Sequence, residues 1–432
     1  MDQQPVVLDP DRPDLHEEGA ALREQGALAR VRFPGLPPEA RVWAVNTQEA
    51  ARVLFTHPGT SRNVLEHWHL NQEGHDLSGF PQAAIFHSPS MGFRDGEDHQ
   101  RMREPVQRAL SPSRIKALRP RIESITAALL DDLERRAAQG GSVDLKRYFA
   151  LPLPMEVICD LLGVDDVQTR ARLRDLSARV VDNSIPAPDE DAPDPADFPR
   201  EVARFVASKR QGRRSRWSWP LRGWSRFVAR KRERPDDLTR VLIDECDRGS
   251  MTEEELVANL VLIVLGGHET TVNLLTTAIQ ALLDNRDQLQ ALREGRIAWK
   301  WVVEEALRWN SPLAYDMFRV ATEDLEIDGH TIKAGDAVAF PLAALGRCPV
   351  THPSKDRDRF DITREHRRHL GFGHGPHLCV GAPLARAEAE IGLEALFERF
   401  PDMELDSETE QQRLPSLTSN GVTSLRVRLT RP

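Results

Sequence analysis

Cysteine is scarce in this chain, and the placement of the few cysteines excludes two kinds of protein. There are four in 432 residues. They lie far apart, at Cys159, Cys246, Cys348 and Cys379, and no two form a C-x-x-C pair. A disulfide framework or a structural zinc site needs closely spaced or evenly paired cysteines. The sequence therefore predicts a protein of a reducing compartment, and the cytoplasm is the expected location.

An excess of positive charge is also missing. The formal net charge is -9, which disfavours a general nucleic-acid-binding protein. The acidic residues 1–19 lack the apolar run of a signal peptide, so neither a leader nor a transmembrane segment is expected. No long linker or internal repeat divides the chain. We therefore expect one domain over residues 1–432, with residues 1–39 as an N-terminal extension.

The most apolar part of the sequence predicts a long helix over residues 253–283. Thr252 and Glu255 form a capping box at its start. Residues 256–265 are apolar on all sides, which indicates a helix through the centre of the protein. Gly266-Gly267-His268-Glu269 interrupts the run too early for a membrane span. Two glycines weaken a helix, so this turn is expected to have a packing or functional reason.

One cysteine lies in an unusual stretch, Phe372 to Gly381, which reads FGHGPHLCVG. Pro383 and an alanine-, leucine- and glutamate-rich run follow, so a helix is predicted to begin just after Cys379. The positive end of that helix and its free N–H groups would lower the pKa of the thiol and favour its metal-binding anion. The residues alone leave open a buried free cysteine in a glycine-rich turn.

The spacing of Phe372, Gly375, Cys379 and Gly381 resembles the haem-binding loop of the cytochrome P450 family. The resemblance covers almost the whole chain after residue 40. It implies a mainly α fold with a small β-rich part, in which haem b lies between the long central helix and the helix after the cysteine loop. In that family the cysteine is the axial thiolate ligand of the iron, and its electron density favours cleavage of the O–O bond.

The resemblance also assigns residues that contact the cofactor. Phe372 would shield the sulfur, while Gly373 and Gly381 would let the backbone approach the haem. Gly266 and Gly267 would thin the central helix so that oxygen fits beside it. Four cationic donors match haem propionate ligands, namely His99, Arg103, Arg319 and His377. From spacing alone, the first two could equally be solvated cations on one helix face.

Two pairs of residues in helices match further family motifs. Thr270 and Glu269 match the alcohol and the acid that relay protons during oxygen activation. Glu305 and Arg308 share a helix face, and in isolation they could be an ordinary surface ion pair. In the family such a pair binds a second arginine, for which Arg359 is the match. These last three residues are expected to be structural.

The implied activity is that of a soluble, bacterial haem-thiolate monooxygenase. It would insert one atom of O2 into a C–H or C=C bond of a hydrophobic or amphipathic small molecule, in natural-product biosynthesis. The implied pocket is mostly apolar and comprises Phe86, Met91, Leu262, Leu265, Ala314, Tyr315 and Val422. The sequence leaves open whether the substrate arrives free or tethered to an acidic carrier protein.

Electrons must come from another protein, because the chain has no G-x-G-x-x-G motif after a strand with which to bind NAD(P)H. A ferredoxin and its reductase are implied. The basic residues Arg101, Arg108, Arg114 and Lys116 would suit an acidic ferredoxin. Two alternatives stay open. One is a peroxide-driven or rearranging haem-thiolate enzyme, against which the Glu269-Thr270 pair counts. The other is a non-catalytic haem sensor or carrier.

A basic, tryptophan-rich insertion spans residues 209–234, with a single acidic residue, Glu233. Trp217, Trp219 and Trp224 lie among its arginines. One interpretation is a solvated charged face. The other is a docking surface for an acidic partner or an anionic membrane.

Overall fold

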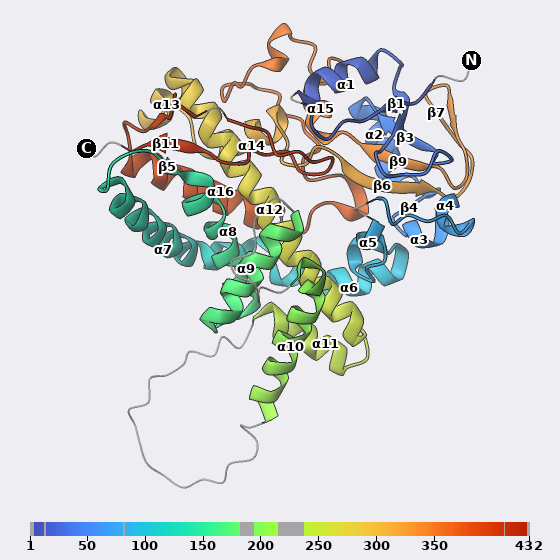
Figure 1. Cartoon of the computed structure of the whole chain (residues 1–432), viewed down its shortest axis with the longest axis horizontal. Helices are drawn as coiled ribbons and strands as arrows, with labels where there is room; N and C mark the ends of the chain where they lie inside the picture. The colour runs from blue at the N-terminus through green and yellow to red at the C-terminus, as the bar shows by residue number, and fades with distance from the viewer. Residues whose placement is uncertain are drawn as a thin grey trace.

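The computed structural model describes residues 4–12, 14–80, 83–181, 194–214, 237–409 and 411–429. Helices make up most of the molecule, the strands of the larger sheet lie together beside the N-terminal region, and a smaller sheet lies on the opposite side, near the C-terminus (Figure 1). The prediction of a mainly α fold with a small β-rich part is confirmed.

A single long helix, α12 (Glu253–Asp284), crosses the centre of the molecule (Figure 1). Its predicted capping box is present, because Thr252 accepts from the Glu255 N–H and Glu255 accepts from the Thr252 N–H. By length and composition α12 could cross a membrane, but 56% of its most apolar window is buried inside the protein. It is the central core helix that the sequence predicts.

Other helices surround α12 and cover its apolar surface. Helices α8, α9, α10, α14 and α16 all contact it. The larger helices are α6 (Gly96–Ala109), α7 (Pro112–Ala137), α8 (Pro152–Leu162), α9 (Val167–Val181), α10 (Phe198–Arg214), α11 (Leu238–Asp247), α13 (Arg286–Arg293), α14 (Lys300–Trp309) and α16 (Ala382–Arg399). Their apolar side chains form one continuous core with those of α12.

The larger sheet has the strand order β1-β2-β3-β9-β6-β4. Its strands are β1 (Val6–Val7), β2 (Leu28–Arg32), β3 (Val42–Val45), β9 (Ala337–Phe340), β6 (Asp316–Ala321) and β4 (Thr60–Ser61). Strand β9 pairs in parallel with β3 and antiparallel with β6. The sheet thus joins N-terminal strands to strands from residues 316–340. Residues 1–39, predicted as an extension, contribute β1 and β2 to it and also form helix α1 (Leu15–Arg23).

Smaller elements complete the fold. A hairpin joins β7 (Leu325–Ile327) and β8 (His330–Ile332) through Asp328-Gly329, and both turn residues have positive φ. A second sheet joins β10 (Glu404–Leu405), β11 (Arg426–Arg428) and β5 (Val143–Asp144).

The glycine- and proline-rich region 61–96 contains short helices. These are α3 (Val64–His67), α4 (His69–Gln72), α5 (Ala83–Phe86) and η1 (Met91–Phe93). Its aromatic residues explain this order. Trp68, Phe80 and Phe86 pack around Phe318 of β6, and this burial orders a glycine- and proline-rich segment that propensity alone would leave irregular.

Candidate cofactor site

The loop before α16 presents the thiol of Cys379. The Cys379 N–H donates to the Phe372 carbonyl at 2.9 Å, which closes the loop upon itself. Gly373 and Gly375 both have positive φ, +72° and +74°, so glycine is required at these two turns. Gly381 is the N-cap of α16, and a Cβ there would lie 3.8 Å from the Cys379 Sγ. The backbone beside the sulfur is therefore open on that side.

The surroundings of Cys379 are those of a group that lines an internal space. The protein around the thiol desolvates it and raises its pKa, yet the residue is exposed. A side chain that is both deep and accessible borders a hollow rather than packed core. The N–H groups of Gly381 and Ala382 and the guanidinium of Arg103 act in the opposite direction on the pKa. Sequence reasoning expected the helix N-terminus and its N–H groups to dominate, but burial outweighs them.

The turn of α12 around Gly266 also borders open space. Gly266 is exposed in the middle of the core helix, and a Cβ there would meet nothing within 4 Å. Thr270, one turn later, is half-buried, and its hydroxyl donates to the Gly266 carbonyl at 2.6 Å. Gly267 differs, because its Cβ would lie 3.0 Å from the Ile158 Cδ1 of α8. The prediction of Gly267 as a cofactor-side residue is therefore wrong, since this glycine allows close packing of α8 on α12.

The carboxylate of Glu269 is buried, and Asn273 supports it. The Asn273 amide donates to the Glu269 Oε1 at 3.2 Å and to the Pro312 carbonyl at 3.3 Å. Sequence reasoning missed Asn273. Its spacing, four residues after Glu269, places the two on one helix face and could have indicated the contact.

A cluster of histidine and arginine side chains lies near the start of α6. The rings of His99 and His377 stack at 4.1 Å between centroids, and the His377 Nε2 lies 3.2 Å from Asp95. Burial, together with His377 and Arg103, lowers the pKa of His99 to about 4. Arg103 donates to the Leu378 carbonyl at 2.5 Å, directly beside the cysteine. The predicted cofactor residues from α6 and from the cysteine loop are thus brought together.

The environment of Arg319 on β6 indicates whether a group that carries carboxylates fits here. Its side chain is buried, and its Nε has no hydrogen-bond partner among the described residues. Burial lowers its pKa to about 10. A buried guanidinium with an unused N–H is costly unless an anion reaches it. With the accessible Cys379 and the open turn at Gly266, this donor set fits a flat, iron-containing cofactor that carries carboxylates.

The predicted structural pair is present, but its third member is a different arginine. Arg308 and Glu305 are fully buried and 2.7 Å apart. The side chain of Arg359 is 81% exposed and approaches Asp356, whereas the Arg364 Nε lies 3.4 Å from Glu305. Arg359 contributes only its carbonyl, which accepts from Arg308 at 3.0 Å. The prediction of Arg359 as the second arginine is wrong, since the chain path brings Arg364 to the carboxylate.

The predicted pocket residues divide into two groups. Leu262, Leu265 and Val422 are half-buried, on the central helix and in the C-terminal segment. The side chains of Phe86, Met91, Ala314 and Tyr315 are instead buried in the apolar cores.

Tyr315, in the second group, has its partners in a distant part of the chain. Its hydroxyl donates to the Glu18 Oε1 at 2.8 Å, and its ring lies edge-on to Phe33. It therefore packs against the N-terminal segment, and the prediction of a substrate contact is wrong for this residue.

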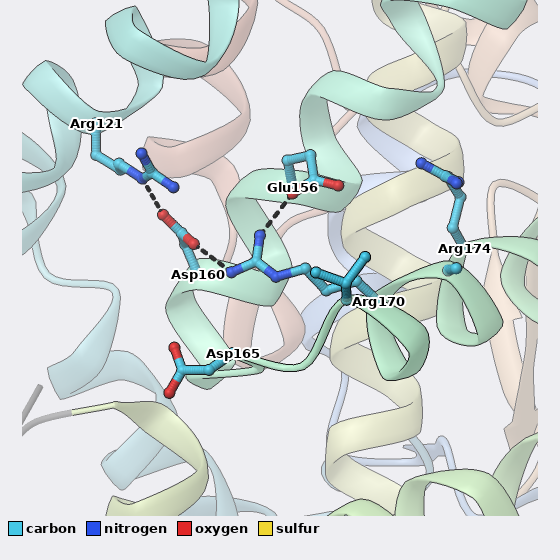
Figure 2. Close-up of a pocket in the computed structure, with 8 residues that line it drawn as sticks. Arg121, Glu156, Asp160, Asp165, Arg170 and Arg174 are labelled. Carbon is cyan, nitrogen blue, oxygen red and sulfur yellow. Dashed lines mark hydrogen bonds and ion pairs between the residues drawn. The ribbon is translucent and has the colours of Figure 1, made fainter. Parts of the chain in front are cut away.

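A separate polar hollow of about 400 Å³ is formed by α7, α8 and α9 (Figure 2). None of the residues predicted to bind the cofactor lines it. Several of its charged groups are paired with one another, as in the contact of Arg170 with Glu156 at 2.5 Å. It is distinct from the space beside Cys379.

The first two cationic residues of the predicted insertion 209–234 form ion pairs within the protein. Lys209 lies 3.0 Å from Asp237, and Arg210 lies 2.8 Å from Glu253, so both are internal ion pairs rather than docking groups. The tryptophan-rich part of that prediction, residues 215–234, lies outside the described residues.

Comparison with known proteins gives a consistent result. A family model described as "Cytochrome P450" matches residues 40–295 and 299–429. A 2-hydroxy-5-methyl-1-naphthoate 7-hydroxylase of Streptomyces carzinostaticus is 36% identical over 428 residues, which cover 98% of this chain and 97% of the relative. Cytochrome P450 monooxygenase PikC of Streptomyces venezuelae is 35% identical, with 97% and 92% covered.

Solved structures agree with this result. The structure of CYP154C4 from Streptomyces sp. W2061 superimposes with a TM-score of 0.86 at 36% identity, covering 100% of this chain and 99% of the other.

Proposed function

Because this chain belongs to the cytochrome P450 family, we propose that it inserts one atom of O2 into a C–H or C=C bond of a hydrophobic or amphipathic small molecule. For hydroxylation the balance is R–H + O2 + 2 e⁻ + 2 H⁺ → R–OH + H2O. The observation that carries the proposal is the accessible thiol of Cys379, which lies deep in the protein. The central helix of the same chain borders open space at its Gly266–Thr270 turn.

Cys379 would bind the iron of haem b as a thiolate, and the haem would supply the activation of O2. Phe372 would cover the sulfur on the side where the Arg386 guanidinium lies 4.5 Å from its ring. His99, Arg103, His377 and Arg319 would hold the propionates, with Arg319 gaining the anion that its buried guanidinium lacks. Gly381 and Gly373 would leave room for the flat ring against the loop.

Thr270 and Glu269 would handle the two protons. The Thr270 hydroxyl stands at the open turn, where it can donate to oxygen and be re-protonated from Glu269. The i−4 bond to the Gly266 carbonyl holds this hydroxyl in place between transfers. Asn273 would keep the Glu269 carboxylate oriented.

We expect the isosteric variant Thr270→Val to lower product formation by roughly 10²-fold, the lower end of what a positioned proton donor contributes. NADPH consumption should continue, with hydrogen peroxide released in place of product. Thr276→Val is a matched control, since the Thr276 hydroxyl also donates to its i−4 carbonyl, at 3.1 Å, but lies in the core. Product per NADPH measured for both variants checks this, and equal ratios would contradict the role of Thr270.

Arg319→Leu should act in opposite directions on two forms of the protein. The haem-free chain should not lose stability, because a buried cation without a bound anion is removed. The loaded protein should lose haem faster, since a propionate contact is gone. Thermal unfolding of the haem-free form and haem transfer to apomyoglobin measure the two effects. Slower or unchanged haem loss would contradict the propionate assignment.

The substrate is proposed to be a sizeable apolar natural product. The half-buried side chains of Leu262, Leu265 and Val422 offer mostly apolar surface. The relatives named above include a hydroxylase of a naphthoate. Titration of such aromatic and polyketide compounds into the protein, followed by the shift of the haem band, would identify ligands. A library without a single shift, together with no turnover, would favour the sensor or carrier function.

Bacterial proteins of this family use redox partners, and we propose a ferredoxin with its reductase, in the cytoplasm. The predicted basic surface is smaller than expected. Arg101 pairs with Glu255 at 2.5 Å and Arg108 with Glu104 at 2.7 Å. Arg114 and Lys116 are exposed, without a described ion pair. NADPH-dependent turnover with a surrogate ferredoxin tests the proposal, and turnover with hydrogen peroxide alone would favour the peroxide-driven alternative.

A further inference from the structure

Helix α9 is held at its start by a charged contact with α8. The Arg170 guanidinium donates to Glu156 at 2.5 Å and to Asp160 at 2.6 Å, and Arg121 of α7 also binds Asp160 (Figure 2). The Asp160 side chain is almost fully buried beneath these arginines. The polar hollow is therefore a structural junction of three helices.

A second polar contact holds α9 further along, and it leads to α12. Ser177 and His268 are both 0% exposed. The Ser177 Oγ lies 2.9 Å from the His268 Nδ1, and the His268 Nε2 lies 2.9 Å from the carbonyl of Leu151, at the start of α8. Leu173 and Leu176 of α9 are buried around the serine. One imidazole thus joins α12 to α9 and to α8 inside an apolar core.

The chemistry of the partners fixes the protonation of the ring. A carbonyl oxygen can only accept, so the His268 Nε2 carries the hydrogen and donates to Leu151. The Nδ1 is then bare and accepts from the Ser177 hydroxyl. Burial lowers the pKa of His268 to about 4, so the ring is neutral at physiological pH. Both ring nitrogens are satisfied in a single tautomer, which permits one ring orientation.

The position of His268 on the helix points away from the open space. Residues of an α-helix are separated by about 100°, so Gly266 and Thr270 share one face and His268 lies roughly opposite. The neighbouring Gly267 lets Ile158 of α8 approach to 3.0 Å of its Cβ position. The turn that carries Glu269 and Thr270 is therefore fixed by contacts on the opposite face of α12, away from the cofactor side.

We propose that His268 is a positioning residue for this turn. Through Ser177 and the Leu151 carbonyl it fixes the rotation and height of the Gly266–Thr270 turn relative to α8 and α9. The Thr270 hydroxyl and the Glu269 carboxylate then meet the reacting oxygen at a constant place. The inference deepens the proposed function and rests on the proton-delivery roles given to Thr270 and Glu269 there.

Three variants of the haem-loaded protein test the link. Ser177→Ala removes the contact to α9 and leaves the donation to Leu151. His268→Leu removes both hydrogen bonds at similar volume. His268→Gln restores a donor and an acceptor on one amide. Thr126→Val is the control, because the Thr126 hydroxyl on α7 is buried and has no described partner.

Two quantities are measured, namely product per NADPH and deuterium exchange of the amides of α9 and of residues 266–273 in the resting protein. We expect His268→Leu and Ser177→Ala to raise exchange and to lower product per NADPH several-fold. His268→Gln should lie closer to the wild type, and Thr126→Val should match it.

The inference is overturned if Ser177→Ala, which leaves the core filled, changes neither quantity. It is also overturned if His268→Gln is no better than His268→Leu. The exchange measurement keeps the two proposals separate. If Thr270→Val keeps the wild-type product per NADPH, the role of Thr270 is refuted. Faster deuterium exchange in Ser177→Ala would still support the structural link through His268.

Discussion

Serine in place of Cys379 is expected to reduce monooxygenase activity below detection. The reduced, carbon-monoxide-treated protein should also lose the absorption band of a thiolate-ligated haem. The physical reason is that serine keeps the size of the side chain but offers an alcohol, which does not ionise at neutral pH and donates far less electron density to iron. Difference spectra and turnover of the purified variant measure both effects.

The chain supplies a matched control for this change. Cys246 is half-buried on α11, and its thiol lies 3.4 Å from Glu253. Cys246→Ser should therefore bind haem and turn over like the wild type. Full activity in Cys379→Ser, or an imidazole-type spectrum in the wild type, would contradict the assignment of the axial ligand.

Local chemistry explains why parts of the site were predictable. The glycines and the proline around Cys379 and the helix after it depend on neighbours within a few residues, and the loop is found as expected. The same holds for the capping box of Thr252 and Glu255, which starts α12 at the predicted residue. Turns and caps are determined by backbone groups close in sequence.

Long-range partner choice was not predictable in the same way. Tyr315 binds Glu18, which lies 297 residues away in the sequence, and no pattern near either residue indicates this. His268 in its apolar helix gave no sign of Ser177 on α9. The direction of Gly267 depends on where α8 packs, which spacing on α12 alone does not specify. Each of these contacts is decided by packing between elements.

The second large effect concerns stability. Arg308→Ala should lower the free energy of unfolding by about 3–5 kcal/mol, because it leaves the Glu305 carboxylate buried without its main partner. Arg308 also donates to the carbonyls of Gly346 at 3.0 Å and Arg357 at 2.8 Å, so the segment before the cysteine loop loses its anchor. Urea unfolding of the loaded protein, followed by the haem band, measures the change.

The same unfolding measurement on Arg364→Ala and Arg359→Ala tests which of the two is the second arginine at Glu305. Arg364→Ala should destabilise less than Arg308→Ala but measurably, since its Nε contacts Glu305 at 3.4 Å from a mostly buried side chain. Arg359→Ala should have little effect, because that side chain is in solvent and its carbonyl contact to Arg308 survives the substitution. A larger loss for Arg359 than for Arg364 would contradict the geometry.

The same ion-pair spacing on the surface provides the control. Arg200 and Asp197 are also three residues apart on α10 and its preceding turn, but their side chains are 78% and 39% exposed. Water already solvates both charges there, so Arg200→Ala should leave the unfolding midpoint almost unchanged. Replacing both residues, Glu305 by leucine and Arg308 by methionine, should cost less than Arg308→Ala alone, because no buried carboxylate is left without its main partner. That order separates the cost of an orphaned carboxylate from the net contribution of the pair.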